Sequence, residues 1–176
     1  MNLDNKKTIF VIIFASLFIV VSIMMMFSGS LFDITGKIRK GDVTKMPDAT
    51  GSTEEIKSGI IIEQTFNSST DSIKSIGIVF SRIGVYEGTH LTIELFKNDE
   101  SLIKKKINTL DVESEHRTFI EATTTLNGMK NKKLKLIISS ENANSGLVVL
   151  TSDTINSVYK IGDKVIKGSL CFSVNE

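Results

Sequence analysis

The sequence of 176 residues has no tryptophan, one cysteine, one proline and two histidines. The single cysteine, Cys171, can form neither an intramolecular disulfide nor a zinc site built from cysteines. The two histidines, His90 and His116, lie in no recognisable nucleophile or metal-binding motif. A formal net charge of +1 gives none of the basic excess that DNA-binding domains carry. We therefore expect a protein that is not an enzyme and does not bind nucleic acid.

One long apolar run, TIFVIIFASLFIVVSIMMMF, occupies residues 8–27 and contains no charged residue, proline or glycine. About 20 helical residues are enough to cross a hydrocarbon core of roughly 30 Å. We therefore predict a single transmembrane helix that acts as a signal anchor. A cleaved signal peptide is the alternative, because two lysines precede the run and small serines follow it. The apolar region of a signal peptide is shorter, however, at about 7–15 residues.

The charges that flank this run bear on its orientation. Lys6 and Lys7 precede it, and four basic residues follow it within a short distance: Lys37, Arg39, Lys40 and Lys45. The positive-inside rule alone favours the second group inside, but a large downstream domain translocates largely regardless of its charge. A short N-terminal tail usually stays in the cytoplasm. We expect residues 1–7 to be cytoplasmic and the C-terminal domain to lie outside the cell membrane.

The remaining chain divides into a polar segment and a β-rich domain. Residues 28–54 are rich in glycine, serine, threonine and charge, and we predict a stalk with at most one short strand. Residues 55–176 contain apolar side chains that alternate with period two. The clearest rows are Ile76, Ile78 and Phe80; Leu91, Ile93 and Leu95; and Leu134, Leu136 and Ile138. Seven to nine short strands with no helical stretch between them predict an all-β antiparallel sandwich, in which KNDES at 97–101 forms a hairpin turn.

Several runs also carry a family resemblance. The order IIIEQTFNSSTDSIKSIGIVFSRIG, LTIELFKNDESLIKKKI, LKLIISSENANSG and KGSLCFSV resembles galactose-binding-like, carbohydrate-binding-module-like jelly-roll domains. Such domains occur on the outer side of bacterial membrane proteins linked to cell-surface polysaccharide synthesis. The resemblance covers residues 55–176 and implies a jelly-roll β-sandwich with a carbohydrate ligand. It does not extend to the several membrane helices or the catalytic portion that these proteins often carry.

Two kinds of candidate ligand-binding residue follow. Exposed aromatic rings commonly cover the apolar face of a sugar, and the tyrosines Tyr86 and Tyr159 are the candidates for this role. Tyr86, near a glycine-flanked turn, is the preferred one. The alternative for Tyr159 is a place in the core, because it alternates with Val158 and Ile161. Clustered lysines suit an anionic envelope polymer or phospholipid headgroups. These lysines are Lys104, Lys105 and Lys106 in LIKKKI, with Lys132 and Lys133 in KNKKLK. The alternative for the lysines is protection of exposed strand edges against pairing with another chain.

Two loops could hold a structural calcium ion, because both are rich in side-chain oxygens. They are NSSTDS at 67–72 and ENANSG at 141–146. The alternative is an ordinary turn shaped by its own side-chain hydrogen bonds. We expect no other cofactor and no catalytic residue.

Together these features predict a membrane-tethered, non-catalytic binding or accessory module outside the cell, in polysaccharide synthesis or export. Its expected partners are the lipid bilayer and a cell-surface glycan, an anionic envelope polymer or a membrane protein. The alternative is a structural or assembly subunit of a surface complex, which resembles a type IV pilin in outline only. The glutamate expected near the start of a pilin's hydrophobic helix is absent.

Overall fold

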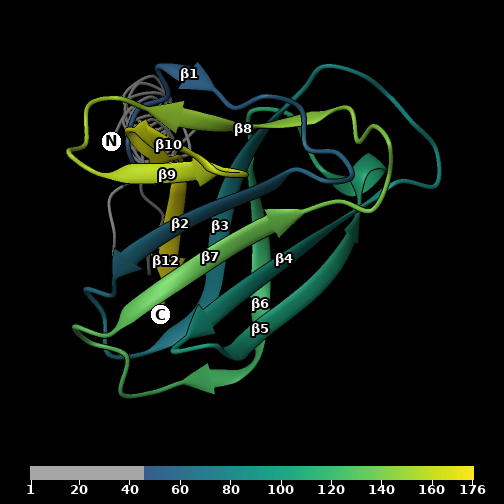
Figure 1. Ribbon diagram of the computed structural model, residues 1–176. Coiled ribbons are helices and arrows are strands. Elements are labelled where there is room, and N and C mark those ends of the chain that lie inside the picture. The colour runs from purple at the N-terminus through teal and green to yellow at the C-terminus, as the bar shows by residue number, and fades with distance from the viewer. Residues whose placement is uncertain (1–45) are drawn as a thin grey trace, which may run out of the picture. The chain divides into compact units, whose positions relative to one another are not determined.

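The computed structural model describes residues 46–176, and its regular structure is almost entirely β (Figure 1). The predicted anchor, residues 8–27, and residues 28–45 of the predicted stalk lie outside the described residues. Between residues 46 and 176 the sole helix is the 3-10 turn η1 (Thr109–Asp111). No helix in this part of the chain is long and apolar enough to span a membrane.

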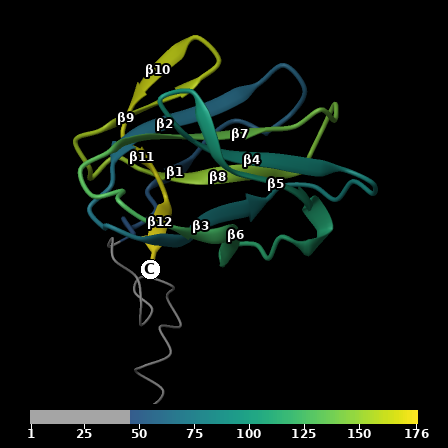
Figure 2. The same cartoon turned by 90° about the horizontal axis from the view of Figure 1, so that it is seen from below.

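The described strands form two sheets, and every pair of neighbouring strands is antiparallel. The first sheet contains β1 (Gly51–Ser52), β3 (Ile73–Arg82), β6 (Arg117–Leu126), β8 (Leu147–Ser152), β11 (Ser169–Leu170) and β12 (Phe172–Asn175). The second sheet contains β2 (Ile61–Asn67), β4 (His90–Lys97), β5 (Glu100–Asn108), β7 (Lys133–Ser139), β9 (Val158–Ile161) and β10 (Lys164–Lys167). In Figure 2, strands β2, β7 and β4 of the second sheet form one layer, and β3 and β6 of the first sheet form the other.

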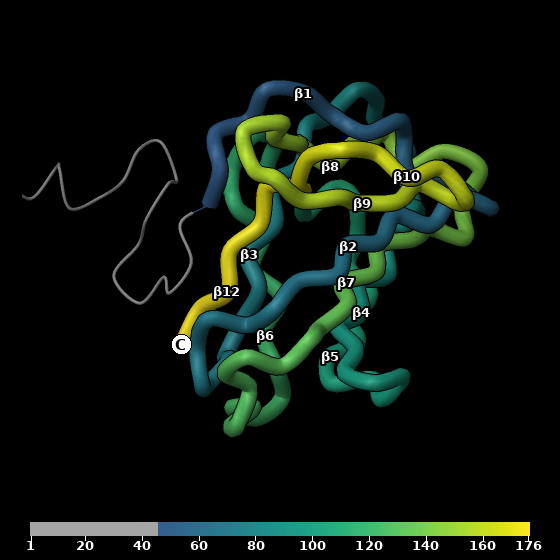
Figure 3. Tube along the Cα trace, turned by 60° about the vertical axis from the view of Figure 1, so that its left-hand side comes forward, coloured from purple at the N-terminus to yellow at the C-terminus, as the bar shows by residue number. Residues whose placement is uncertain are grey.

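The strand order explains how the C-terminus is held. In the second sheet the order is β10-β9-β2-β7-β4-β5. In the first sheet β3 pairs with β8 through Phe80–Arg82 and with β12 nearer its start. Cys171 lies between β11, which pairs with β8, and β12, which pairs with β3. Its N–H donates to the Leu150 carbonyl of β8, and its own carbonyl accepts from the N–H of Val79 in β3. The tube view follows β12 beside β3 down to the C-terminus (Figure 3).

The core lies between the two sheets and is built from the alternating rows that the sequence predicts. All nine side chains of those rows are buried, and they belong to one apolar cluster with residues from both sheets. The antiparallel sandwich is therefore confirmed. The predicted hairpin is also confirmed, because β4 and β5 pair along their length. Its turn contains Asn98 and Asp99 with positive φ values of 48° and 69°, which these two residue types tolerate.

The packed structure begins earlier than residue 55. Met46 is buried against Val79 and Cys171 on the outward side of the first sheet, and Thr53 is buried as well. The N–H of Thr53 donates to the Val149 carbonyl, and β1 pairs with β8. Residues 46–54, which the composition assigns to the stalk, are therefore part of the sandwich.

Candidate binding surfaces

The outward side of the second sheet carries six lysines, and we call it the lysine face. Side chains alternate between the two sides of a strand, so the lysines that separate buried core residues must point outward. On β7, for example, Lys133 and Lys135 alternate with buried Leu134 and Leu136. Strand register places the other members on the same side. The lysine face comprises Lys104, Lys106, Lys133, Lys135, Lys160 and Lys167.

Two carboxylates lie among these lysines. Glu94 pairs with Lys104 at 3.1 Å, and Glu63 pairs with Lys160 at 3.0 Å. On the strands themselves the lysine face therefore keeps a formal excess of four positive charges. Two loop carboxylates at its rim, Asp99 and Glu141, approach Lys135 and Lys106 at 3.9 and 3.7 Å and are almost fully exposed. Such exposed pairs contribute little, and the face remains positive.

The position of each lysine in the sheet separates the two explanations for the lysine clusters. β5 and β10 are the outer strands, so protection of a strand edge accounts for Lys104 and its neighbours there. β7 and β9 are interior strands with a neighbour on both sides. Lys135 and Lys160 have a paired residue on each side, so edge protection cannot account for these two lysines. Lys133 pairs with Asn67 of β2 alone, because the pairing of β7 with β4 ends at Lys135. A solvated sheet face or a ligand accounts for Lys135 and Lys160.

The structure brings together only part of the predicted lysine group. Lys104, Lys106 and Lys133 share the lysine face, with β4 lying between their strands. Two strand spacings separate β5 from β7, about 10 Å. Lys105 pairs with core-facing Ile93, so it projects from the other side of β5. Lys132 lies in the turn before β7. Lys105 and Lys132 are therefore not part of this surface.

A shallow hollow of about 230 Å³ lies on the lysine face beside the β4–β5 turn. Its lining consists of Thr65, Phe96, Asn98, Asp99, Lys133, Leu134 and Lys135. The Lys135 Nζ lies 5.5 Å from the centroid of the Phe96 ring, close enough for a cation–π interaction. The hollow thus combines an aromatic ring, a hydroxyl, an amide, two cations and the carboxylate of Asp99. Phe96 is absent from the predicted ligand residues, although the alternation with Leu95 already places it on the outward side.

Of the two tyrosines, Tyr86 is the exposed one, at 42% of its surface. Its ring lies against Gly84 and Gly146, where an added Cβ would come within 2.9 Å and 3.1 Å of ring atoms. The hydroxyl of Thr89 donates to the Tyr86 carbonyl and fixes the loop. Tyr159, by contrast, is buried at 6% and belongs to the core cluster. Tyr159 therefore offers no exposed ring for a sugar, because its alternation with outward Lys160 turns the ring into the core.

Gly146→Ala is expected to destabilise the protein and to displace the Tyr86 ring. Gly146 has a φ of +70°, and an added Cβ would lie 2.2 Å from the carbonyl oxygen of Gly84. The backbone conformation alone costs an alanine about 1–2 kcal/mol, and the collision adds to it. Gly128→Ala is the matched control, since its φ is +71° and no atom lies within 4 Å of its added Cβ. Urea denaturation should show the larger loss for Gly146→Ala, and equal losses would contradict this packing.

The two loops predicted to hold calcium are shaped by hydrogen bonds. In 141–146 the Asn142 Oδ1 accepts from the His90 N–H, and one Glu55 oxygen accepts from the N–H groups of Ser145 and Gly146. In 67–72 the Ser68 hydroxyl donates to the Thr70 carbonyl. No group of three or more histidine, cysteine, aspartate or glutamate residues gathers anywhere between residues 46 and 176 to hold a metal.

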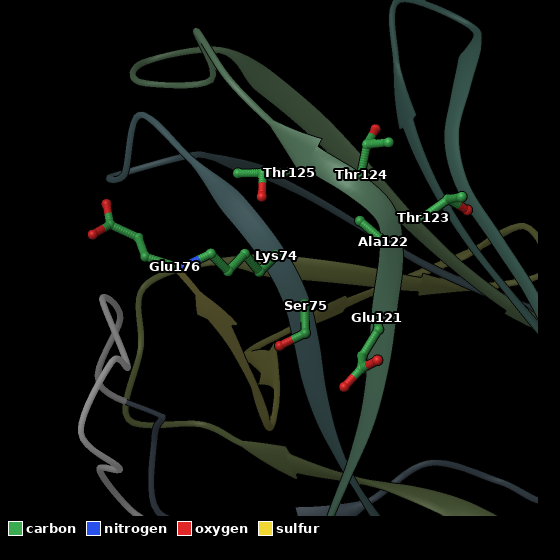
Figure 4. Close-up of a pocket in the computed structure, with 8 residues that line it drawn as sticks. All are labelled: Lys74, Ser75, Glu121, Ala122, Thr123, Thr124, Thr125 and Glu176. Carbon is green, nitrogen blue, oxygen red and sulfur yellow. The ribbon is translucent and has the colours of Figure 1, made fainter.

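A larger hollow of about 460 Å³ lies in the first sheet, where β6 separates from β3 (Figure 4). Ile73 pairs with Leu126 and Ser75 pairs with Glu121. Residues 122–125 of β6 therefore lie opposite the single residue Lys74 of β3. The lining consists of Lys74, Ser75, Glu121, Ala122, Thr123, Thr124, Thr125 and Glu176. It offers hydroxyl groups and opposite charges but no aromatic ring. No local pattern in the sequence indicates this irregularity.

No protein-family model matches the chain, and no curated protein matches it significantly. The described residues define a β-sandwich domain of two antiparallel sheets with a lysine-rich outward face. The inference of function therefore rests on these surfaces and on the sequence.

Proposed function

We propose that the chain is a membrane-tethered, non-catalytic binding module that holds an anionic envelope polymer against the lysine face outside the cell. One observation carries this proposal. Lys135 and Lys160 project from positions that are paired on both sides, where lysine has no role in protecting a sheet edge. The tether and the location rest on the apolar run at residues 8–27 and its flanking charges.

We further propose that the sandwich belongs to the jelly-roll class. The order β1-β8-β3-β6 in one sheet and β2-β7-β4-β5 in the other supports this assignment. Along the chain, β1 to β8 alternate between the sheets except at the β4–β5 hairpin, as in a fold made of two Greek keys. Strands β9 and β10 extend the second sheet beyond β2, and β11 and β12 pair with β8 and β3 in the first sheet. This order agrees with the resemblance to galactose-binding-like domains, which implies a carbohydrate ligand.

The chemistry of the lysine face favours a polymer that carries both charge and hydroxyl groups. Each exposed lysine contributes little by itself, at about 0.2–1 kcal/mol per ion pair. A polymer with repeated anionic groups engages several lysines together and responds to the summed potential of the face. Thr65, Thr92 and Ser139 point outward between the lysines and can hydrogen-bond to sugar hydroxyls. Phosphate-bearing or uronate-bearing glycans meet both requirements.

Binding to an anionic polymer is expected to weaken as ionic strength rises. Charges at a protein surface are screened over about 10 Å at 0.1 M salt. The experiment is a titration of the full-length protein in detergent with a teichoic-type phosphate polymer and with a neutral glycan, each at two salt concentrations. We expect measurable affinity for the phosphate polymer, lower at the higher salt concentration. Equal, salt-insensitive affinity for the neutral glycan would contradict the proposal.

Tyr86 supports a second candidate, recognition of a neutral sugar. Its exposed ring rests on two glycines, which gives it a fixed base. In the same titration this candidate predicts that Tyr86→Ala removes binding of the neutral glycan at both salt concentrations. Tyr86→Phe is the control that keeps the ring. If neither ligand binds at millimolar concentration, contact with a membrane protein becomes the favoured role.

A further inference from the structure

The hollow beside the β4–β5 turn lies where two neighbouring strands of the second sheet separate. Strand β7 pairs with β4 only from Lys135 onward, opposite Phe96, whereas it pairs with β2 from Lys133 onward. After Phe96 the chain enters the hairpin turn, in which Asn98 and Asp99 have positive φ. Residues from both sides of this opening line the hollow of about 230 Å³. Its walls are therefore set by paired strands and a two-residue turn.

Strand register aligns three side chains across this hollow. Phe96 of β4 lies opposite Lys135 of β7, and Lys135 lies opposite Thr65 of β2. Each of the three follows a buried residue in its own strand, so all three point outward. Two strand spacings make the row about 10 Å long. The row therefore presents an aromatic ring, an ammonium group and a hydroxyl group at spacings that the sheet fixes.

The rest of the lining adds groups that hydrogen-bond to hydroxyls and to anions. Lys133 brings a second ammonium group, and Asn98 brings an amide. Asp99 brings a carboxylate that is almost fully exposed and lies 3.9 Å from the Lys135 Nζ. Amide and carboxylate oxygens accept hydrogen bonds, whereas ammonium and amide N–H groups donate them. The same Nζ lies 5.5 Å from the centroid of the Phe96 ring, so a ligand held against this ring has a substituent within reach of a cation.

We propose that this hollow is the subsite that binds one sugar ring bearing an anionic substituent, a carboxylate or a phosphate. The inference rests on the proposed function of the lysine face, of which the hollow is a part. Phe96 covers the C–H face of the sugar ring. Lys133 and Lys135 receive the anionic substituent, and Thr65 and Asn98 bond to the hydroxyl groups. The hollow is smaller than the roughly 300–1,000 Å³ of pockets for drug-sized ligands, so it takes one ring of a longer polymer.

The side chains of the hollow distinguish such a ligand from a polyanion without rings. A ringless polyanion responds to the summed positive potential, which the whole lysine face provides. It gains nothing from Phe96, and the carboxylate of Asp99 repels it at this position. A sugar ring that places its anionic substituent on the lysines can turn its hydroxyl groups toward Asp99, where they donate hydrogen bonds. In this account the lysines supply affinity, and the hollow selects among anionic polymers.

Two anionic polymers with one charge per repeat test this subsite. One is a polyuronate, which is built from sugar rings, and the other is a poly(glycerol phosphate), which contains none. The Kd of each is measured at low and at higher salt with the full-length protein in detergent. Phe96→Ala and Phe96→Leu remove the flat ring, and Phe96→Tyr keeps it. Thr65→Val and Thr92→Val each remove one outward hydroxyl, but Thr92 lies outside the hollow and serves as the matched control.

We expect Phe96→Ala and Phe96→Leu to weaken polyuronate binding roughly three- to tenfold, the range of one aromatic contact. Phe96→Tyr should restore this binding, and poly(glycerol phosphate) should bind all three variants as it binds the parent protein. Thr65→Val should weaken polyuronate binding more than Thr92→Val does. All variants must keep the thermal midpoint of the parent.

The subsite is overturned if both polymers bind in a salt-dependent manner and the loss of the Phe96 ring weakens neither, or weakens both equally. That result would leave the lysine face intact as a binding surface for polyanions. If neither polymer binds the parent protein, the proposed function itself fails, and the subsite fails with it.

Discussion

Ile78→Asp is expected to prevent the domain from folding. Ile78 lies in the middle of β3, is fully buried and pairs with both β6 and β12. The substitution removes the transfer free energy of the buried side chain, about 1.5–3 kcal/mol. It also buries an unpaired carboxylate, which costs several kcal/mol more. A domain of ordinary stability, about 5–15 kcal/mol, loses most or all of its margin.

The readouts are β-type circular dichroism and the protease resistance of residues 46–176 in the full-length chain. Thr65→Asp is the matched control, since it introduces the same carboxylate at an exposed position of interior strand β2. That variant should keep the spectrum and the resistance of the parent protein. A well-folded Ile78→Asp protein would mean that the register of β3 is wrong by one residue.

The fold class follows from local sequence patterns because burial of one strand face enforces a period of two. Ile76, Ile78 and Phe80 show this directly, since each is fully buried in the core cluster. The β4–β5 hairpin follows for a similar reason. Its turn residues, Asn98 and Asp99, tolerate the positive φ that a tight turn requires. In both cases the determining interactions lie within a few residues of one another.

Strand order and candidate surfaces depend on contacts between distant residues. Lys104 and Lys133 are 29 positions apart in the chain, and only the pairing of both strands with β4 brings them onto one face. Lys160 and Lys167 join this face through β9 and β10, although neither belongs to a lysine cluster in the sequence. The irregularity between β3 and β6 is likewise a property of the pair, because neither strand shows it alone.

The two tyrosines show how far alternation alone can decide exposure. Tyr159 lies between outward Val158 and Lys160, a pattern that already places its ring in the core. Tyr86 lies in a loop, where no periodicity applies. Its ring lies against Gly84 and against Gly146, which comes from a distant loop. The neighbours of Tyr159 in the sequence therefore indicate its burial, and only the three-dimensional structure shows the surroundings of Tyr86.

Charge reversal on the lysine face is expected to have the largest effect on binding. Lys133→Glu/Lys135→Glu removes two attractions and adds two repulsions at interior strand β7. At roughly 0.2–1 kcal/mol for each such interaction, the expected loss is about 1–4 kcal/mol, a roughly five- to several-hundred-fold weaker Kd. Lys105→Glu/Lys164→Glu is the matched control. It makes the same change in net charge on strands of the same sheet, but both side chains project from the opposite side.

The Kd of a teichoic-type phosphate polymer for these two variants, measured at low salt beside the parent protein, tests the central claim most directly. Both variants must keep the thermal midpoint of the parent, so that folding does not enter the comparison. The lysine face predicts the full loss for Lys133→Glu/Lys135→Glu and less than a threefold change for Lys105→Glu/Lys164→Glu. Equal losses in the two variants would show that the polymer responds to net charge alone, and unchanged binding in both would remove the lysine face as the binding surface.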